Sequence, residues 1–336
     1  MKKRYLFLVL LIILPFVNAQ ELDNYPLILV HGHAISIGEA KNFLTEYEEK
    51  GSFDKLEDFQ IRLDNENLYK NKNIILPSQN FKEACIQPRD SKISVRTTYY
   101  VDFNGNFDDH ASIEEYSERV GKVVEIVKKC ANSNKVNLFG YSMGGLVVRE
   151  YARNYPKNVN KIITIATPNF GFSEKLGPKT LCSAFRHDYD IECREMEENS
   201  NFLKELNSYK FQNTYTISGI LKNRDILGLI CTSHGGCNDG IVCTKLSMVP
   251  EAKNYIVYAD KPSNDLNYIK SGIHQDLVNP WTKSGDEAYK IVKGILNNEK
   301  LLTNENELEN KCRIKQSYLK IFIENLKNKL KFLLIS

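Results

Sequence analysis

Residues 140–145 read Gly-Tyr-Ser-Met-Gly-Gly, and the interpretation of the whole chain starts from this stretch. Residues 135–139 before it, Lys-Val-Asn-Leu-Phe, are typical of a short buried strand, and residues 146–153 after it are typical of a helix. A G-x-S-x-G sequence between a strand and a helix predicts a sharp turn that holds a serine hydroxyl above the edge of a sheet. The alternative is an ordinary glycine-bearing turn that happens to contain Ser142.

Apolar runs on both sides of this turn predict a mainly parallel sheet. Residues 25–30 form a continuous apolar run that ends at His31-Gly32-His33, and a run without polar alternation suits a strand buried on both faces. Ser112 followed by Glu115 fits a capping box at the start of a helix. The remaining elements are expected as strands at 94–103, 161–168, 211–220 and 254–258 and as helices at 39–49 and 287–296. The alternation of strands and helices predicts an α/β fold with helices flanking the sheet.

Residues 170–210 depart from this alternation. The stretch is polar, contains Cys182 and Cys193, and directly follows a predicted core strand. It reads either as a lid inserted over a site or as a surface insertion without a role. The lid is favoured because long inserts in compact domains are usually functional.

The first residues, Met1 to Ala19, have the pattern of a signal peptide. Three basic residues precede an apolar run, and small residues follow before Gln20. The chain is therefore expected to be secreted or bound to the cell envelope, the alternative being an uncleaved N-terminal anchor. Cleavage would remove three basic residues and no acidic residue from a chain with a formal net charge of +3. The remaining chain would have no net positive charge to attract nucleic acid, so no nucleic-acid partner is expected.

Eight cysteines follow Ala19, and an even number in an exported chain indicates disulfides. The pairing cannot be read from the sequence, because eight cysteines permit 105 connectivities. Local pairs are expected for Cys182 with Cys193 and for one pair among Cys231, Cys237 and Cys243. A zinc site made by that triplet is the alternative, but its spacing differs from the C-x-x-C of zinc ribbons.

A serine hydroxyl becomes a useful nucleophile when a histidine accepts its proton and an acid orients that histidine. On strand-to-helix turns of this kind, the acid and then the histidine follow the serine in the chain. His274 lies after the last predicted central strand and before the closing helix, which makes it the expected base. His234 precedes that strand and is the alternative.

Two aspartates compete for the role of the acid. Asp239 lies in Asn238-Asp239-Gly240-Ile241-Val242, where a glycine permits a tight turn, and Asp260 follows the last predicted strand. Asp276 is too close to His274 in the chain for a partner on a separate loop. Position alone leaves Asp239 and Asp260 open, and Asp239 could belong to an ordinary Asp-Gly turn.

Five motifs now occur in a recognisable order: 30–33 (Val-His-Gly-His), 140–145, 165–171 (Ile-Ala-Thr-Pro-Asn-Phe-Gly), 238–242 and 273–274 (Ile-His). Together they resemble the secreted lipases and esterases of the α/β-hydrolase superfamily, over roughly residues 26–296. The resemblance implies an α/β-hydrolase domain, bounded here as residues 20–300. It also implies Ser142 as nucleophile, His274 as base and Asp239 as the acid.

The resemblance further implies an oxyanion hole made by the backbone N–H groups of His33 and Met143. No cofactor is expected. Some relatives bind a structural calcium near the catalytic histidine, and Asp276 matches one such ligand, but no aspartate stands at the partner position upstream of Asp239. The chain also has Thr-Pro-Asn at 167–169, where many of these lipases have Thr-Pro-His.

The expected activity is therefore hydrolysis of carboxylic esters through an acyl-enzyme, with lipid esters as the expected substrates. Two enzyme alternatives use the same groups, an acyl-thioester hydrolase and an acyltransferase. The non-enzymatic alternative is a binding protein on an inactive hydrolase fold, which an intact set of Ser142, Asp239 and His274 argues against.

Residues 301–336 lie beyond the resemblance and predict a basic amphipathic helix. Apolar residues recur every four positions from Ile314 to Leu330, while lysines and Arg313 occupy the positions between. Such a helix suits the surface of an anionic membrane. The alternative is a helix that packs against the hydrolase body through the same apolar stripe.

Overall fold

The computed structural model describes residues 25–33, 52–85, 90–172, 191–221, 231–259 and 272–304. Several predictions concern residues outside these ranges. They include the signal peptide at 1–19, the helix at 39–49, residues 173–190 of the lid and the tail from residue 305, as well as Cys182 and Asp260. These stay predictions.

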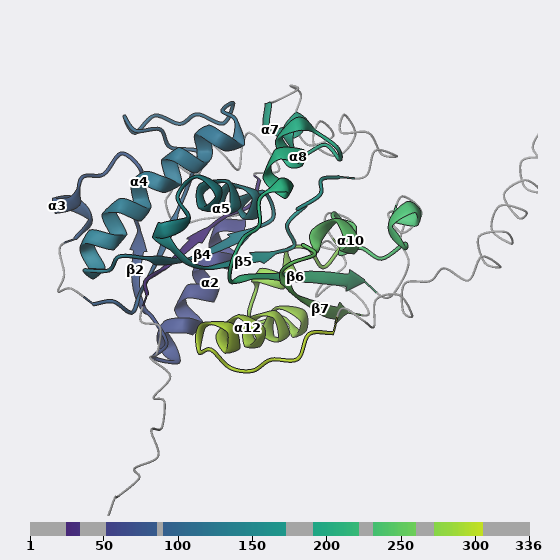
Figure 1. Cartoon of the computed structure of the whole chain (residues 1–336). Helices are drawn as coiled ribbons and strands as arrows, with labels where there is room; N and C mark the ends of the chain where they lie inside the picture. Colours follow the sequence, from purple (N-terminus) through teal and green to yellow (C-terminus); the bar gives the residue numbers. More distant parts are fainter. Residues whose placement is uncertain are drawn as a thin grey trace, which may run out of the picture.

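A seven-stranded sheet forms the centre of the described chain, and all its pairings are parallel (Figure 1). Its order is β2-β3-β1-β4-β5-β6-β7. In that order the strands span Lys70–Ile74, Ile93–Thr97, Leu27–Val30, Val136–Tyr141, Val159–Ile165, Thr214–Leu221 and Lys253–Ala259. The predicted mainly parallel sheet is thus confirmed. Because the strands are parallel, the loops that follow them meet at one edge, where such sheets bind ligands.

Helices cover both faces of the sheet and bury its alternate residues in two cores. Ile28 and Val30 of β1 pack with α4 (Ile113–Ala131) and α5 (Met143–Asn154). Leu27 and Leu29 pack with α2 (Ser52–Asn65) and α12 (Lys283–Leu296). All four strand residues are fully buried, which explains the continuous apolar run in the sequence.

The predicted helix start at Ser112 is confirmed in detail. The Ser112 hydroxyl accepts a hydrogen bond from the Glu115 amide at 3.1 Å, and the Glu115 carboxylate accepts one from the Ser112 amide at 2.9 Å. The helix ends at Asn132, whose backbone is left-handed at a φ of 52°. This reciprocal cap fixes where α4 begins against the sheet.

The segment 52–85 contains elements that the sequence analysis did not predict. Here α2 buries Leu56, Phe59 and Leu63, and β2 adds an edge strand beside β3. A short helix, α3 (Phe81–Ala84), follows. The segment therefore packs on the central sheet and extends it by one strand.

The described parts of 170–210 pack on that body. Two short helices follow there, α7 (Ile191–Glu195) and α8 (Asn201–Ser208), and in Figure 1 α8 lies beside α5 and α7 beside α8. Leu203 and Leu206 of α8 are buried in the same core as α4 and α5. Residues 173–190 lie outside the described ranges, so the lid remains a proposal.

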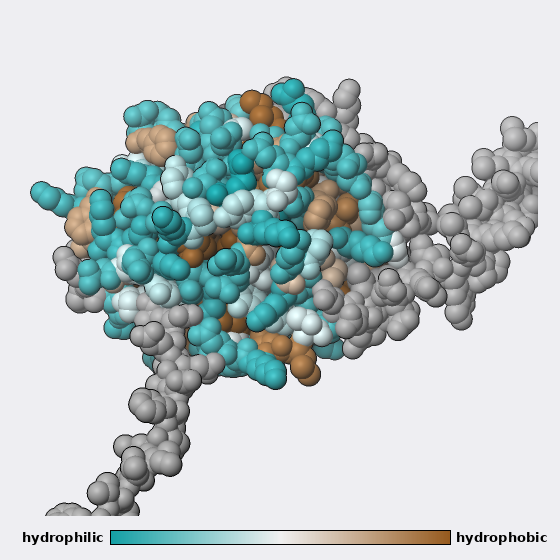
Figure 2. Space-filling view, viewed as in Figure 1, coloured by the Kyte–Doolittle hydropathy of each residue, from teal (hydrophilic) through white to brown (hydrophobic). Residues whose placement is uncertain are grey.

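Disulfides join Cys85 to Cys130 and Cys231 to Cys243, and Cys193 and Cys237 are also disulfide-bonded. The second pair confirms the expected bond within the Cys231, Cys237 and Cys243 triplet. Such bonds are typical of proteins that fold in an oxidising compartment outside the cytosol. None of the helices that the structure describes has the length and hydropathy needed to cross a membrane. The face in Figure 2 is mainly hydrophilic, with small separate apolar patches.

Candidate active site

Ser142 lies on a sharp turn between β4 and α5, as the G-x-S-x-G motif predicts. Its φ and ψ are 51° and −127°, a conformation that L-residues seldom adopt. A side chain could not replace Gly140 or Gly144, because their added Cβ atoms would lie 2.5 Å from Gly144 O and 2.2 Å from His31 O. The two glycines therefore allow the backbone to fold tightly around the serine.

Three side chains from separate loops form one hydrogen-bonded chain at this turn. Ser142 Oγ lies 3.1 Å from His274 Nε2, and His274 Nδ1 lies 2.8 Å from Asp239 Oδ2. With the carboxylate as acceptor, Nδ1 carries the proton and donates it, so Nε2 is free to accept from the serine hydroxyl. The structure brings together the three residues that the sequence analysis assigned as nucleophile, base and acid.

All three side chains are shielded from water. Ser142 is 8% exposed, His274 3% and Asp239 1%. The enclosure of Ser142 has a local cause, because the loop at Gly32 approaches so closely that an added Cβ there would lie 2.9 Å from Ser142 Cβ.

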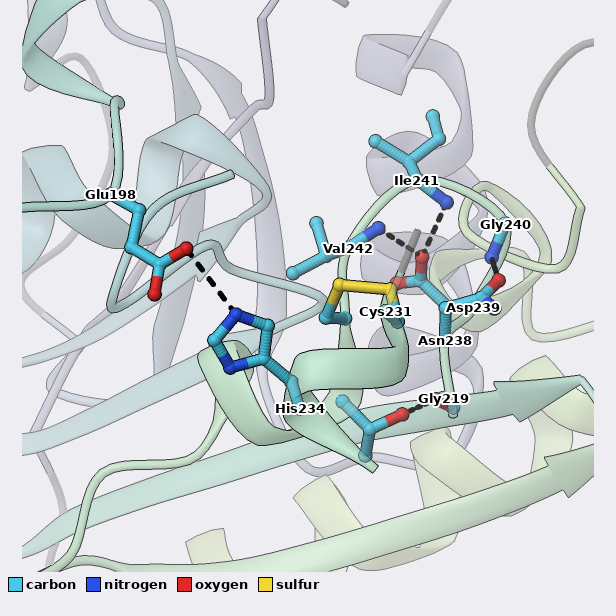
Figure 3. The surroundings of a disulfide bond; sticks show 11 residues. Glu198, Gly219, Cys231, His234, Asn238, Asp239, Gly240, Ile241 and Val242 are labelled. Atoms are coloured by element: carbon cyan, nitrogen blue, oxygen red, sulfur yellow. Dashed lines mark hydrogen bonds and ion pairs between the residues drawn. A yellow bond between two sulfur atoms is a disulfide. The ribbon is translucent and has the colours of Figure 1, made fainter. Parts of the chain in front are cut away.

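The Asp239 carboxylate is held by the turn in which it lies (Figure 3). Its Oδ1 accepts hydrogen bonds from the amides of Ile241 at 2.9 Å and Val242 at 2.8 Å. Gly240 supplies the φ of 108° that this turn requires. With Oδ1 occupied by these amides, Oδ2 is the oxygen that faces His274.

The loop after β1 runs beside the serine turn, because Val30 pairs with Gly140 in the sheet. His31 is buried, its Nδ1 lies 2.6 Å from the Gly32 carbonyl, and its Nε2 lies 2.8 Å from Thr98 Oγ1. Burial lowers the pKa of His31 to about 4, so the ring is neutral at ordinary pH. Its neutral form donates to the carbonyl and accepts from Thr98, which fixes the loop next to Ser142.

The two expected oxyanion-hole residues directly follow Gly32 and Ser142 in the chain. Met143 is the first residue of α5, where helix amides lack partners within the helix. His33 follows Gly32, and its side chain contacts the buried Glu192 of α7, Nε2 to Oε1 at 3.4 Å. The ring of His33 thus points toward α7.

The other sequence candidates lie elsewhere. His234, the alternative base, contacts Glu198 at 3.3 Å, as Figure 3 shows. The carboxylate that contacts His274 is that of Asp239. Asp276 begins the short η3 turn (Asp276–Val278) and is buried. In the ranges that the structure covers, no three His, Cys, Asp or Glu side chains are grouped closely enough to hold a metal ion.

Two glycines that the sequence analysis did not assign pack directly on the acid. A Cβ at Gly219 of β6 would lie 2.8 Å from Asp239 Cβ, and one at Gly272 would lie 2.5 Å from Asp239 O. The Asp239 carbonyl also accepts a hydrogen bond from the Ile273 amide at 2.8 Å. These contacts join the acid's turn to the loop of His274. Nothing in the sequence marks these two glycines, because each approach joins residues distant in the chain.

Comparison with known proteins agrees with this fold. A family model described as the alpha/beta hydrolase fold matches residues 84–179, which include the serine turn. No curated protein sequence matches the chain significantly.

Some solved structures have a partly similar chain trace. The lin2722 gene product of Listeria innocua is 18% identical with a TM-score of 0.48, over 84% of this chain and 97% of that one. The mature lipase BlEst2 of Bacillus licheniformis is 12% identical with a TM-score of 0.49, over 81% and 92%. The metagenomic carboxyl esterase MGS0156 is 12% identical with a TM-score of 0.47, over 81% and 75%.

Proposed function

The chain has the α/β-hydrolase fold, and from this premise we propose that it is a serine hydrolase of carboxylic esters. The proposal is carried by one observation, the continuous chain of contacts from Ser142 Oγ through His274 to Asp239 Oδ2. Ser142 is the nucleophile, His274 the base and Asp239 the residue that orients the histidine.

The reaction follows from the donors and acceptors at the site. Ser142 Oγ attacks the acyl carbon while His274 Nε2 takes the hydroxyl proton, and Asp239 stabilises the imidazolium that forms. The C–O bond to the alcohol then breaks, and His274 returns the proton to the leaving oxygen. Water next attacks the acyl-enzyme, with His274 again as base, and releases the acid and the free serine.

Negative charge develops on the carbonyl oxygen in the tetrahedral intermediates. We assign its stabilisation to the backbone N–H groups of Met143 and His33. The N–H group of Met143 suits this role because Met143 begins α5, and the helix dipole favours negative charge at a helix N-terminus. A donor of this kind contributes about 3 to 4 kcal/mol to transition-state stabilisation in a well-studied protease.

Lipid esters are the proposed substrates, because the five motifs resemble those of secreted lipases and esterases. A panel of nitrophenyl esters from short to long chain, beside an emulsified triglyceride and an acyl thioester, tests this choice. A preference for the thioester, or for transfer to an added alcohol over hydrolysis, would replace the ester-hydrolase assignment with the corresponding alternative.

Replacement of the nucleophile tests the mechanism. Ser142→Ala should reduce kcat by about 10³-fold or more, because no other group can form the acyl-enzyme. It should also abolish labelling by a fluorophosphonate. Ser208→Ala on the exposed end of α8 is the matched control and should retain both properties. Near-normal turnover by a folded Ser142→Ala protein would contradict the proposal.

We propose that the protein is exported, because residues 1–19 have the pattern of a signal peptide. The disulfides support export, since such bonds form in oxidising compartments. The expected mature protein begins at Gln20. N-terminal sequencing of protein recovered outside the cytoplasm checks this, and recovery of intact Met1 in the membrane fraction would favour the uncleaved anchor.

A further inference from the structure

The segment that carries the proposed acid is closed on itself by a disulfide. Cys231 and Cys243 are 12 positions apart, and Asp239 lies between them. We call residues 231–243 the acid loop. It begins with the short η2 turn (Cys231–His234) and ends where α10 (Thr244–Ser247) starts.

The acid loop has other contacts as well, and Cys237 in its middle is also disulfide-bonded. Asn238 and Cys243 form an isolated antiparallel bridge, the Thr244 amide donates to Cys237 O at 2.9 Å, and the Gly236 amide donates to Cys231 O at 2.7 Å. Gly235 and Gly236 both have a positive φ, 90° and 82°. Two adjacent glycines give this part of the chain many alternative conformations once a constraint is removed.

The disulfide is also the apolar centre of the acid loop. Cys231 and Cys243 are 2% and 4% exposed and form a small cluster with Leu246, against which Phe170 packs. Figure 3 shows the bond lying directly beside the turn of Asp239. Val242, whose amide holds Asp239 Oδ1, is the residue next to Cys243. A shift of Cys243 would therefore move a donor that fixes the carboxylate.

The geometry points to the Cys231–Cys243 disulfide as a positioning element for catalysis, which holds Asp239 Oδ2 against His274 Nδ1. This inference rests on the proposed serine-hydrolase function. A disulfide that only stabilises the fold would leave kcat unchanged in the folded protein. Loss of a positioning disulfide should lower kcat although the protein is still folded.

The second disulfide provides a matched control. Cys85–Cys130 joins the end of α3 to α4 and closes a longer stretch, 45 positions. Loss of the bond that closes the longer loop should free more unfolded-chain entropy and lower stability at least as much. Loss of Cys85–Cys130 should thus lower stability at least as much as loss of Cys231–Cys243, whereas loss of Cys231–Cys243 should lower kcat more.

The experiment compares Cys231→Ala/Cys243→Ala with Cys85→Ala/Cys130→Ala in the full chain, using a soluble ester well below the unfolding transition. The first variant should lose about tenfold or more in kcat with KM nearly unchanged, since a misplacement near 1 Å is enough for such a loss. The second should keep kcat within about twofold, although its urea midpoint falls at least as far. Equal kcat values for the two variants would overturn the inference.

A double-mutant cycle shows whether the bond acts through the acid. In an Asp239→Asn background, removal of Cys231–Cys243 should lower kcat by less than about twofold more, because the positioned group is already lost. A full additional tenfold loss would mean that the bond acts elsewhere. If Ser142→Ala keeps its turnover, the proposed function itself is contradicted. If Ser142→Ala is inactive but the cycle gives additive losses, only the role of the disulfide is contradicted.

A third variant separates the covalent bond from its packing. Cys231→Val/Cys243→Ala retains apolar contact with Leu246 and Phe170 without the bond, and it also serves if the double alanine protein does not fold. It should show the same loss in kcat. Recovery of wild-type kcat in this variant would show that apolar packing suffices and would overturn the role of the bond.

Discussion

Ser142 combines the reactive hydroxyl with a backbone conformation that is costly for any residue except glycine. Its φ of 51° and ψ of −127° are maintained by the hydrogen bond from its amide to Ile165 O at 2.9 Å and by the glycines on both sides. Non-glycine residues in such regions cost of order 1–3 kcal/mol. The protein therefore gives up stability to hold the side chain over the sheet.

That cost predicts a gain from glycine at this position. Ser142→Gly should unfold with a free energy about 1 kcal/mol higher than Ser142→Ala, after the larger unfolded-state entropy of glycine is deducted. Urea unfolding of these two variants measures it. The control pair is Ser117→Gly and Ser117→Ala in the middle of α4, where the order should reverse. If both pairs rank alanine first, the turn is not strained.

His31 predicts a pH dependence of stability that is separate from activity. Its pKa is lowered from 6.5 to about 4 by burial and by the neighbouring His33, so the unfolded chain binds a proton in this range and the folded chain does not. Stability should therefore fall as pH falls from about 6.5 to 4, by up to about 1.4 kcal/mol per pH unit from this residue.

The comparison with His31→Gln isolates this contribution. The variant should be less stable at pH 7, because it loses the contact with Thr98, but should lose less stability on acidification. Glu195, whose pKa is raised to about 7 by burial, contributes stability below about pH 4.5 that is lost as pH rises through 7. Its opposite slope is common to both proteins and cancels in the difference. Parallel curves for the two proteins would contradict the assignment to His31.

At the scale of elements, β6 positions the acid through the absence of a side chain. A Cβ on Gly219 would meet Asp239 Cβ at 2.8 Å and the side chains of Leu277 and Ile273 at 2.9 Å and 3.1 Å. Gly219→Ala should therefore displace Asp239 and lower kcat by about tenfold or more. Ser218→Ala, at the adjacent buried position of β6, should leave kcat nearly unchanged. Equal activity of the two variants, measured on a soluble ester, would show that the strand tolerates the extra methyl group.

The elements that the sequence predicted are those with a strong apolar pattern. Strands β1, β4 and β5 are buried on both faces, and their apolar runs marked them within a few residues. In contrast, β2 is a sheet edge with the polar sequence Lys-Asn-Lys-Asn-Ile, which carries no such run. The helix α2 does have apolar residues at helical spacing, at 56, 59 and 63, but charged residues surround them.

The candidate site also has a part that the sequence predicts and a part that it does not. The serine turn and the order of acid and histidine could be predicted, because each depends on a short local sequence or on chain order. The contacts of Gly219 and Gly272 with Asp239, and the pairing of Cys85 with Cys130, could not. They join residues far apart in the chain, and only the folded arrangement specifies them.

At the scale of the whole molecule, the proposed chemistry lies at the edge where the parallel strands end. The basic tail, residues 301–336, is a separate feature of the sequence. Seven cationic residues occur between Lys311 and Lys331, with Glu324 as the single acid among them. A basic amphipathic helix near an anionic bilayer gains about 1 kcal/mol per lysine or arginine. We propose that this tail binds anionic membrane surfaces and brings the hydrolase to lipid substrates.

Removal of positive charge tests this proposal. Replacement of Lys320, Lys327, Lys329 and Lys331 by glutamine keeps the apolar stripe and should reduce cosedimentation with anionic vesicles by about tenfold or more. Binding of the unaltered protein should also weaken as salt rises, because screening acts on exposed charges. Hydrolysis of a soluble ester should be unchanged, since the tail lies outside the residues assigned to the reaction. Vesicle binding that persists in the glutamine variant would assign the apolar stripe to packing on the hydrolase body, because contact through that stripe does not depend on the lysines.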